Sequence, residues 1–412
     1  MTANFFGMIM VVSLLFGCGG GDPGGVGSIP DGSVPTASIS APATSYLGAK
    51  IQLDGSGSLG STGSSLIYSW VLLSAPAGSS SAIDNSTSQQ PFFIADRVGD
   101  YQVSLVVTSA GHSNAPAIKS LSVIYSYLAD TGQTLSYTTT QGEDSDYSGR
   151  ALSFTDMGNG TVVDSNTGLS WQKTPDMVNR TYPAAQSYCT NLTLGGVSDW
   201  RLPNKKEMMG ILNYGSNPTI DSAFYSDSSF QEYWTSPFTN GVGLAWLVST
   251  TYGWAIIMDG INLEKTRCVS GHEITYGALT DNNDGSVSDA TTQLQWVQGE
   301  TSPMTWEGAI TYCENLDFDG HTDWRLPNIK EIGTLTQETV FIDGTTGNSA
   351  ALDYLYFPDS KQNERPGMNP YWSSTSGSTS PTEAWVINFT TGYAITYPKV
   401  ASYSVRCVRG AL

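Results

Sequence analysis

The chain contains the same six-residue motif twice, and this repeat limits the folds that its C-terminal two-thirds can adopt. The sequence Asp-Trp-Arg-Leu-Pro-Asn occupies residues 199–204 and returns at residues 323–328. Each motif follows a cysteine, Cys189 or Cys313, that lies ten positions earlier, and Arg-Cys-Val recurs near the end of each copy. Equal spacings over such lengths indicate a duplicated structural unit, so we predict one domain used twice.

The two copies span residues 151–272 and 273–412, and both show the pattern of an α+β domain. Apolar residues recur at helical spacing around the first cysteine of each copy, and a second helix is expected directly after each motif. The rest of each copy has the short alternating runs and turn residues that indicate strands. Asp199 and Arg201 are interpreted as a structural charged pair at the start of the second helix.

The chain has five cysteines, and four of them lie in the duplicated region. An even number of cysteines in an exported protein indicates disulfide bonds, and four cysteines allow three pairings. Each copy carries one cysteine on its first predicted helix and one on its last predicted strand. The simplest pairing therefore forms one bridge within each copy: Cys189–Cys268 and Cys313–Cys407.

The first residues have the pattern of an export signal. Residues 5–16 form an apolar run that is too short to span a bilayer, and Leu15-Phe16-Gly17-Cys18 resembles the lipobox of bacterial lipoproteins. We therefore expect a signal peptide at 1–17, lipidation of Cys18 and a glycine-rich tether at 18–33. The protein is then expected in the cell envelope, in the outer membrane, facing the surface or the periplasm. A secretory signal without lipidation is the alternative.

Residues 34–126 show the pattern of a separate β-sandwich, because short runs of alternating apolar residues are separated by Gly, Ser, Pro and Asn clusters. The segments Leu53-Asp54-Gly55, Tyr68-Ser69-Trp70 and Gly99-Asp100-Tyr101 resemble the PKD domain, an immunoglobulin-like module of surface proteins. That resemblance implies a spacer or stalk. Residues 127–150 are polar and are interpreted as a linker.

The duplicated unit resembles the Lcl C-terminal domain family, named for a bacterial collagen-like adhesin. The family pattern includes Tyr-Cys-x-Asn-Leu, Asp-Trp-Arg-Leu-Pro, Tyr-Trp-Ser-Ser and Arg-Cys-Val-Arg-Gly, and both copies carry most of it. The resemblance implies a C-type-lectin-like fold and a role like that of surface adhesins that bind polysaccharides. The expected architecture is multidomain: an all-β immunoglobulin-like sandwich followed by two α+β C-type-lectin-like domains.

A sugar-binding site needs aromatic faces and short polar side chains. The tryptophans that recur in both copies are interpreted as core, so the better ligand candidates are aromatic residues that do not recur, together with a serine pair beside one recurring tryptophan. The candidate ligand-binding residues are Tyr252, Trp254, Ser373, Ser374, Tyr393 and Tyr397.

One segment also resembles a calcium-binding loop by its ligand types and glycine placement. Asp281, Asn283 and Asp289 surround the turn of a predicted hairpin. A hairpin turn explains the same residues equally well, since Asp, Asn and Gly are the residues that such turns favour. Calcium is therefore retained as a possible ligand, and no other cofactor is expected.

The net charge of –19 disfavours nucleic acid as a partner. The chain has three histidines, His112, His272 and His321, which lie in different parts of the sequence without metal-ligand spacing. No nucleophile–base pair is recognisable, so we expect a binding protein and not an enzyme. The expected partners are the membrane through the lipid anchor and a polysaccharide or protein ligand. The alternatives are a structural or protein-interaction component of the envelope and, more weakly, an enzyme of the formylglycine-generating-like fold.

Overall fold

Strands dominate the computed structural model, and the helices are short. The structure describes residues 33–47, 49–125, 127–224, 231–238, 243–338, 351–353, 355–358 and 370–410. Cys18, the predicted signal peptide and most of the predicted tether lie outside the described residues. The chain divides into two compact units between Ile124 and Tyr125. Among the described residues, no helix is long and apolar enough to cross a membrane.

The N-terminal unit contains two sheets that share one core. The larger sheet has the order β1-β7-β5-β3, with β6 paired to β5, and the smaller sheet pairs β2 with β4. Their bounds are β1 Thr44–Tyr46, β2 Lys50–Gln52, β3 Ile67–Ser74, β4 Phe92–Ile94, β5 Gly99–Ser109, β6 His112–Ser113 and β7 Ala117–Ile124.

Side-chain alternation in β3 explains why this segment forms a strand against a core. Tyr68 and Trp70 are buried, whereas Ser69 between them and Ile67 and Val71 on either side are exposed. The hydroxyl of Tyr101 donates to the carbonyl of Arg97 over 2.9 Å and accepts from its amide over 3.1 Å. A tyrosine bonded to backbone a few residues upstream is a common corner contact of immunoglobulin-like sandwiches.

The C-terminal unit holds both copies of the repeat, and the two predicted helices occur in each. Copy 1 contains β8 Phe154–Asp156, β9 Thr161–Asp164, β10 Ser170–Gln172, α1 Tyr182–Thr190, β11 Trp200–Arg201, α2 Lys205–Gly210, β12 Glu232–Phe238, β13 Leu244–Ser249, β14 Ala255–Asp259 and β15 Val269–Ser270. Copy 2 contains β16 Leu279–Asp281, β17 Ser286–Asp289, β18 Leu294–Val297, α3 Trp306–Glu314, α4 Ile329–Thr334, β19 Pro370–Ser376, β20 Glu383–Asn388, β21 Tyr393–Pro398 and β22 Val408–Gly410.

Both predicted disulfides are present. Cys189 of α1 is bonded to Cys268, and Cys313 of α3 is bonded to Cys407. Each bridge ties the first helix of a copy to the segment just before its last strand. The four sulfur-bearing side chains are buried in the core of their own copy.

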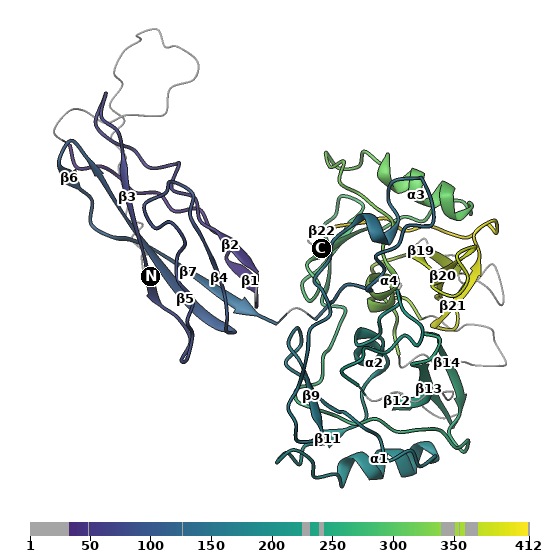
Figure 1. Cartoon of the computed structure of the whole chain (residues 1–412). Helices are drawn as coiled ribbons and strands as arrows, with labels where there is room; N and C mark the ends of the chain where they lie inside the picture. The colour runs from purple at the N-terminus through teal and green to yellow at the C-terminus, as the bar shows by residue number, and fades with distance from the viewer. Residues whose placement is uncertain are drawn as a thin grey trace, which may run out of the picture. The chain divides into compact units, whose positions relative to one another are not determined.

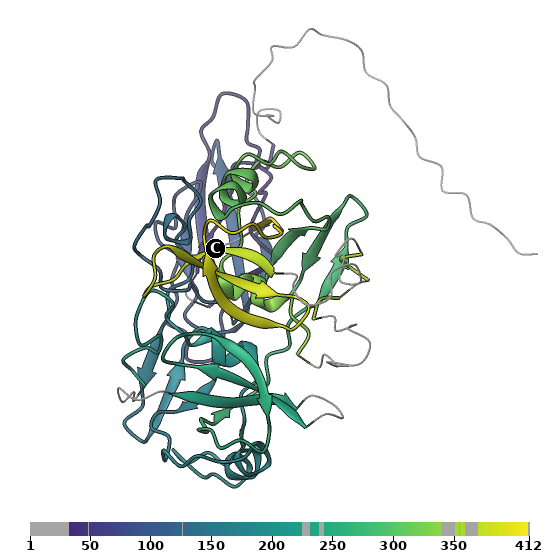
Figure 2. The same cartoon turned by 90° about the vertical axis from the view of Figure 1, so that its right-hand side faces the viewer.

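The two copies are joined in one sheet, which the sequence analysis did not predict. Strands β12, β13 and β14 of copy 1 continue into β21, β20 and β19 of copy 2. The junction is an antiparallel pair of Ala255 with Ala394, which occupy equivalent positions in the two copies. Antiparallel pairing of equivalent residues places a local two-fold axis at this junction. Figures 1 and 2 show the result: α2 and α4 lie at the centre of the unit, and α1 (teal) and α3 (green) lie at opposite ends.

The segment predicted as a linker, residues 127–150, is instead part of the C-terminal unit. Four of its polar side chains are buried, namely Thr131, Gln133, Glu143 and Asp144, and it contains the short 3-10 helix η1 Asp144–Asp146. The prediction was wrong because it treated a polar composition as a sign of exposure. Here hydrogen bonds satisfy the buried polar groups, so that their burial is tolerated.

Candidate ligand-binding site

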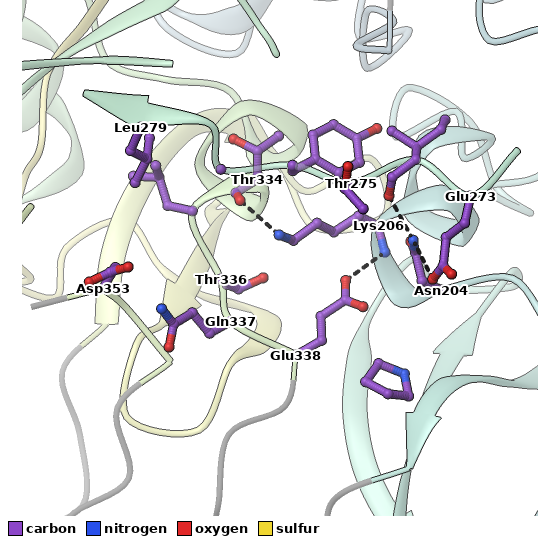
Figure 3. A pocket seen from close by; sticks show the side chains of 15 residues that line it. Asn204, Lys206, Glu273, Thr275, Leu279, Thr334, Thr336, Gln337, Glu338 and Asp353 are labelled. Carbon is purple, nitrogen blue, oxygen red and sulfur yellow. Dashed lines mark hydrogen bonds between the residues drawn. The ribbon is translucent and has the colours of Figure 1, made fainter. Parts of the chain in front are cut away.

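An open cavity of about 520 Å³ lies between the two copies. Four chain segments build it: the start of α2, the end of β12, the connection between the copies and the segment that follows α4. Figure 3 shows the lining side chains on these segments. They are Asn204, Lys206, Pro237, Glu273, Ile274, Thr275, Tyr276, Gly277, Leu279, Thr334, Leu335, Thr336, Gln337, Glu338 and Asp353.

A second hollow of about 410 Å³ adjoins this cavity on the copy 1 side. The two hollows share Pro237 and Glu273. The second is lined further by Tyr182, Pro183 and Gln186 of α1 and by Ser236 of β12. We call the two together the copy 1 groove.

Lys206 lies at the centre of the groove (Figure 3). Its ammonium donates to the carbonyl oxygen of Thr334 over 2.9 Å, and its backbone amide donates to Glu338 Oε1 over 3.1 Å. The ammonium also lies 5.4 Å from the ring centroid of Tyr276. Burial lowers the pKa of Lys206, and the charge of Glu338 opposes this shift. The lysine is thus held in place with part of its hydrogen-bonding capacity facing the cavity.

Carboxylates outnumber ammonium groups along the groove. Glu273, Glu338 and Asp353 line it, against the single lysine Lys206. Burial raises the pKa of Glu338, and the charges of Lys206 and Lys205 oppose this shift. The groove therefore offers a predominantly acidic surface with one fixed donor.

A double cap fixes α2, which carries Asn204 and Lys206 into the groove. Asn204 Oδ1 accepts from the amide of Glu207 over 2.8 Å, and Glu207 Oε2 accepts from the amide of Asn204 over 2.8 Å. Arg201 binds both carboxylate oxygens of Glu207 at 2.8 Å. The interpretation of Asp199 as the partner of Arg201 was therefore wrong: Asp199 instead accepts from the Ser270 hydroxyl over 2.6 Å.

Lys205 is buried beneath the wall of the groove and holds that wall in place. Its side chain is fully buried, and its ammonium donates to Thr336 Oγ1 over 2.9 Å and to the carbonyl of Gly392 over 3.1 Å. It also lies 4.1 Å from the ring centroid of Trp246. Burial lowers the pKa of Lys205 to about 7. The contacts join three segments from both copies, so that the wall of the cavity is rigidly supported.

The structure does not bring the predicted ligand residues together. Ser373 and Ser374 are buried: the Ser373 hydroxyl donates to the carbonyl of Trp385 over 2.9 Å, and the Ser374 amide donates to the carbonyl of Pro327 over 2.8 Å. Their assignment as ligand contacts was wrong, because the strand that carries them, β19, is covered on both faces.

The predicted aromatic candidates also lie outside the groove lining. Tyr393 packs edge-on against Trp246 at 6.2 Å, and Tyr397 packs against Tyr403 at 5.1 Å. Trp254 is half-buried against the core. Tyr252, in the turn after β13, is the exposed residue among the four aromatic candidates, with 40% of its surface accessible.

Two of the three predicted calcium residues, Asp281 and Asn283, lie at a hairpin turn. Asp281 Oδ1 accepts from the amide of Asn283 over 2.8 Å, and Asn283 adopts a positive φ of 62°. Asp289 is buried at the far end of the ladder and accepts from the amide of Thr291. Among the described residues, no three His, Cys, Asp or Glu side chains converge as metal ligands.

The groove residues were not predicted from the sequence, although one pattern indicates them. A Lys-Glu pair follows the Asp-Trp-Arg-Leu-Pro-Asn motif in both copies, as Lys206-Glu207 and Lys330-Glu331. A charged pair repeated at the start of a short helix indicates a fixed interior role. Glu273, Glu338 and Asp353 carry no such signal, because they lie on connections between regular elements.

Several solved structures are remotely similar to this chain. A nucleoside hydrolase-related hypothetical protein from Saccharophagus degradans is 23% identical over 22% of this chain and 25% of that chain, with a TM-score of 0.20. The C-terminal fragment of intimin, solved with the intimin-binding domain of its translocated receptor, is 12% identical over 57% of this chain and 100% of the fragment, with a TM-score of 0.20. The adhesin InvE of Yersinia pseudotuberculosis is 13% identical over 90% of this chain and 97% of that chain, with a TM-score of 0.19. This chain thus spans about a quarter of the first of these proteins, and TM-scores so low support no conclusion.

No curated protein matches the chain. The Lcl C-terminal domain, by contrast, matches residues 160–270 and 285–409, which together are more than half of the sequence. The two matched segments fall in copy 1 and copy 2. The chain therefore belongs to the Lcl C-terminal domain family.

Proposed function

We propose that this protein is a lipid-anchored adhesin of the bacterial cell envelope that binds its ligand in the copy 1 groove. Cys18 carries the lipid, the PKD-like sandwich serves as a stalk, and the paired C-terminal-domain copies with a lectin-like fold form the binding head. The family membership supports the adhesin role. The motif Leu15-Phe16-Gly17-Cys18 supports the anchor.

The observation that carries the proposal is the open cavity of about 520 Å³ between the copies. It has the size of a ligand pocket and is lined by convergent polar groups on rigid elements. Carboxylates, an ammonium, amides and hydroxyls from Lys206, Glu338, Gln337 and Thr336 surround it, with the ring of Tyr276 at its edge. Such an inventory suits hydroxyl, amide or cationic groups of a polysaccharide or protein ligand.

We propose binding, and not catalysis, as the role of the groove. Its lining contains no histidine or cysteine. The thiols of Cys189, Cys268, Cys313 and Cys407 are consumed in disulfides, so that the described part of the chain offers no free thiol as a nucleophile.

An array experiment tests this proposal. The full chain carrying Cys18→Ser, which lacks the proposed lipid site, is applied to arrays of glycans and of extracellular proteins. Every ligand found is measured again with Glu273→Lys and with the matched control Asp317→Lys, which changes an exposed carboxylate outside the groove lining. We expect binding that Glu273→Lys weakens and Asp317→Lys does not. Equal binding by both variants contradicts the groove as the site.

A further inference from the structure

The counterpart of the copy 1 groove in copy 2 is filled by the chain itself. Equivalent hydrogen bonds establish the correspondence: the amide of Ser236 donates to Pro203, and the amide of Ser374 donates to Pro327, both over 2.8 Å. The position equivalent to Pro237 is therefore Thr375. We call residues 130–147, which occupy this second position, the strap.

Side chains of the strap bind the β19 strand of copy 2. Asp144 Oδ2 accepts from the hydroxyl of Thr375 over 2.6 Å, and Gln133 Oε1 accepts from the amide of Ser376 over 2.7 Å. Glu143 accepts from the hydroxyl of the same Ser376. The strap thus covers the end of β19. The corresponding end of β12 in copy 1 carries Pro237, which lines the groove.

The strap also contacts the counterparts of the other groove walls. The carbonyl of Asp130 accepts from the Lys330 ammonium over 2.8 Å, and the carbonyl of Thr131 accepts from the amide of Tyr214 over 2.6 Å. Gly142 lies so close to Ile310 of α3 that an added Cβ would come within 2.7 Å of it. Each of these three contacted residues has a counterpart in the copy 1 groove at the same distance from its motif. Lys330 corresponds to Lys206, Tyr214 corresponds to Glu338, and Ile310 corresponds to Gln186.

The corresponding lysine of copy 1 has one acceptor fewer. Lys330 donates to two carbonyls, one at the end of α2 (Gly210) and one on the strap. Within the described part of the chain, Lys206 donates to a single carbonyl, that of Thr334 at the end of α4. Figure 3 shows the Lys206 side chain in the lining of the cavity, with its ammonium bonded to Thr334. The groove therefore presents a donor at the place where a main-chain carbonyl is bound in copy 2.

We propose that the copy 1 groove docks an extended polypeptide segment of a partner protein, which follows the course of the strap and carries basic side chains. This proposal rests on the proposed function and names its ligand class. Main-chain carbonyls of such a segment would accept from Lys206, as the strap accepts from Lys330. Its ends would lie along α1 and β12, where Gln186 and Pro237 leave the second hollow open.

Charge decides against a second copy of this chain as the occupant. The strap carries Asp130, Glu143, Asp144 and Asp146. The Asp144 carboxylate accepts from the hydroxyl of Thr375 in copy 2 and from that of Thr131 within the strap. In copy 1, Pro237 replaces the threonine, and Glu273, Glu338 and Asp353 line the groove. An acidic strap from another molecule would therefore meet carboxylates and would find no hydroxyl at the position of Thr375, whereas Lys or Arg side chains would be attracted.

A displayed library of random dodecapeptides, selected on the full Cys18→Ser chain, tests this inference. The selected peptides are synthesised and measured by fluorescence anisotropy against the wild-type groove, Gln186→Trp and Glu273→Lys. Gln186→Trp fills the second hollow, and Ala184→Trp on the same helix is its control, because Ala184 is exposed and outside the lining. We expect peptides rich in Lys and Arg whose affinity falls about tenfold or more in both groove variants and stays unchanged in the control.

Three other results would overturn the inference. Peptides that bind the control and both groove variants equally would show that the groove is not the docking site. Selection of no peptide, while an array glycan binds and is lost in Gln186→Trp, would reject a polypeptide ligand but retain the proposed function. Equal binding of the synthetic strap peptide, residues 130–147, would reject the requirement for basic side chains. If the Cys18→Ser chain bound no glycan and no protein on the arrays, the proposed function itself would be rejected.

Discussion

Lys206 and Lys330 form a reciprocal pair across the local two-fold axis. The Lys206 ammonium donates to the carbonyl of Thr334, the last residue of α4, and the Lys330 ammonium donates to the carbonyl of Gly210, the last residue of α2. Both bonds are 2.9 Å long. Each copy thus caps the C-terminal end of the other copy's helix, where a cation is favoured. This exchange makes the two copies one structural unit and leaves Lys206 as the fixed donor of the groove.

Removal of the Lys330 ammonium should destabilise the C-terminal unit. Lys330→Met leaves the carbonyls of Gly210 and Asp130 without this donor, at a cost of about 1–3 kcal/mol of unfolding free energy. Urea denaturation followed by tryptophan fluorescence measures the change. Lys119→Met in the N-terminal unit is the control and should change little. Equal stability of the Lys330 variant and the wild type would contradict the reciprocal cap.

A methyl group at Gly392 should disturb the contact between the copies. An added Cβ would lie 2.7 Å from the Trp246 ring, and the residue has a positive φ of 75°. Gly158 has a similar φ of 70° but no atom within 4 Å of an added Cβ, so Gly158→Ala isolates the backbone cost. We expect Gly392→Ala to lower the thermal midpoint more than Gly158→Ala, with an extra cost of about 1–3 kcal/mol. Equal midpoints would mean that the packing of Trp246 on copy 2 is loose.

Stability should depend on pH through the strap. Burial raises the pKa of Asp144 to about 7, although Thr375 and Thr131 donate to its carboxylate. A carboxyl group with a raised pKa stays protonated in the folded chain while the unfolded chain ionises, so stability is lost as the pH rises from about 4 to about 7. Between about pH 5 and pH 8, the wild type should lose about 2.5 kcal/mol relative to Asp144→Asn.

Urea denaturation of both proteins at the two pH values tests this expectation. Only the difference between them is informative, because the buried Lys205 and Lys330, whose pKa values burial lowers to about 7, add stability as the pH rises. A difference in unfolding free energy that is independent of pH would show that Asp144 ionises normally in the folded protein.

The lipid anchor depends on Cys18, which precedes the part of the chain that the structure describes. Cells that express the wild type and are fed labelled palmitate should incorporate label, and the protein should partition into the detergent phase of Triton X-114. Cys18→Ser should lose both properties, because one sulfur carries the lipid. Label retained in the Cys18→Ser variant would contradict lipidation at this residue.

The repeat predicted much of the C-terminal unit, because the helices and the cysteine positions are determined by patterns over short stretches of sequence. The spacing of Cys189 and Cys313 from the motif, with helical periodicity around them, placed the helices and indicated both disulfides. The shared sheet could not be predicted, since Ala255 and Ala394 pair across 139 positions without any distinctive composition. The strap was missed for a related reason: buried polar residues such as Asp144 look like exposed residues until their partners are known.

The candidate site was less predictable than the fold. Aromatic residues and serines were chosen for their chemistry, but Ser373 and Tyr393 are used for packing within and between the copies. The groove arises from what copy 1 lacks, namely a strap, and the sequence of copy 1 does not display that difference. Only the comparison of Pro237 with its counterpart Thr375 in the folded structure makes it visible.

Cell adhesion is the most direct measurement of the central claim that the copy 1 groove is the binding site. Cells that display the wild type, Glu273→Lys or Asp317→Lys at equal surface density are placed on a surface coated with the ligand found on the arrays, and those retained under flow are counted. The account predicts retention of the wild type and of Asp317→Lys, with retention of far fewer Glu273→Lys cells. Equal retention of all three would contradict it.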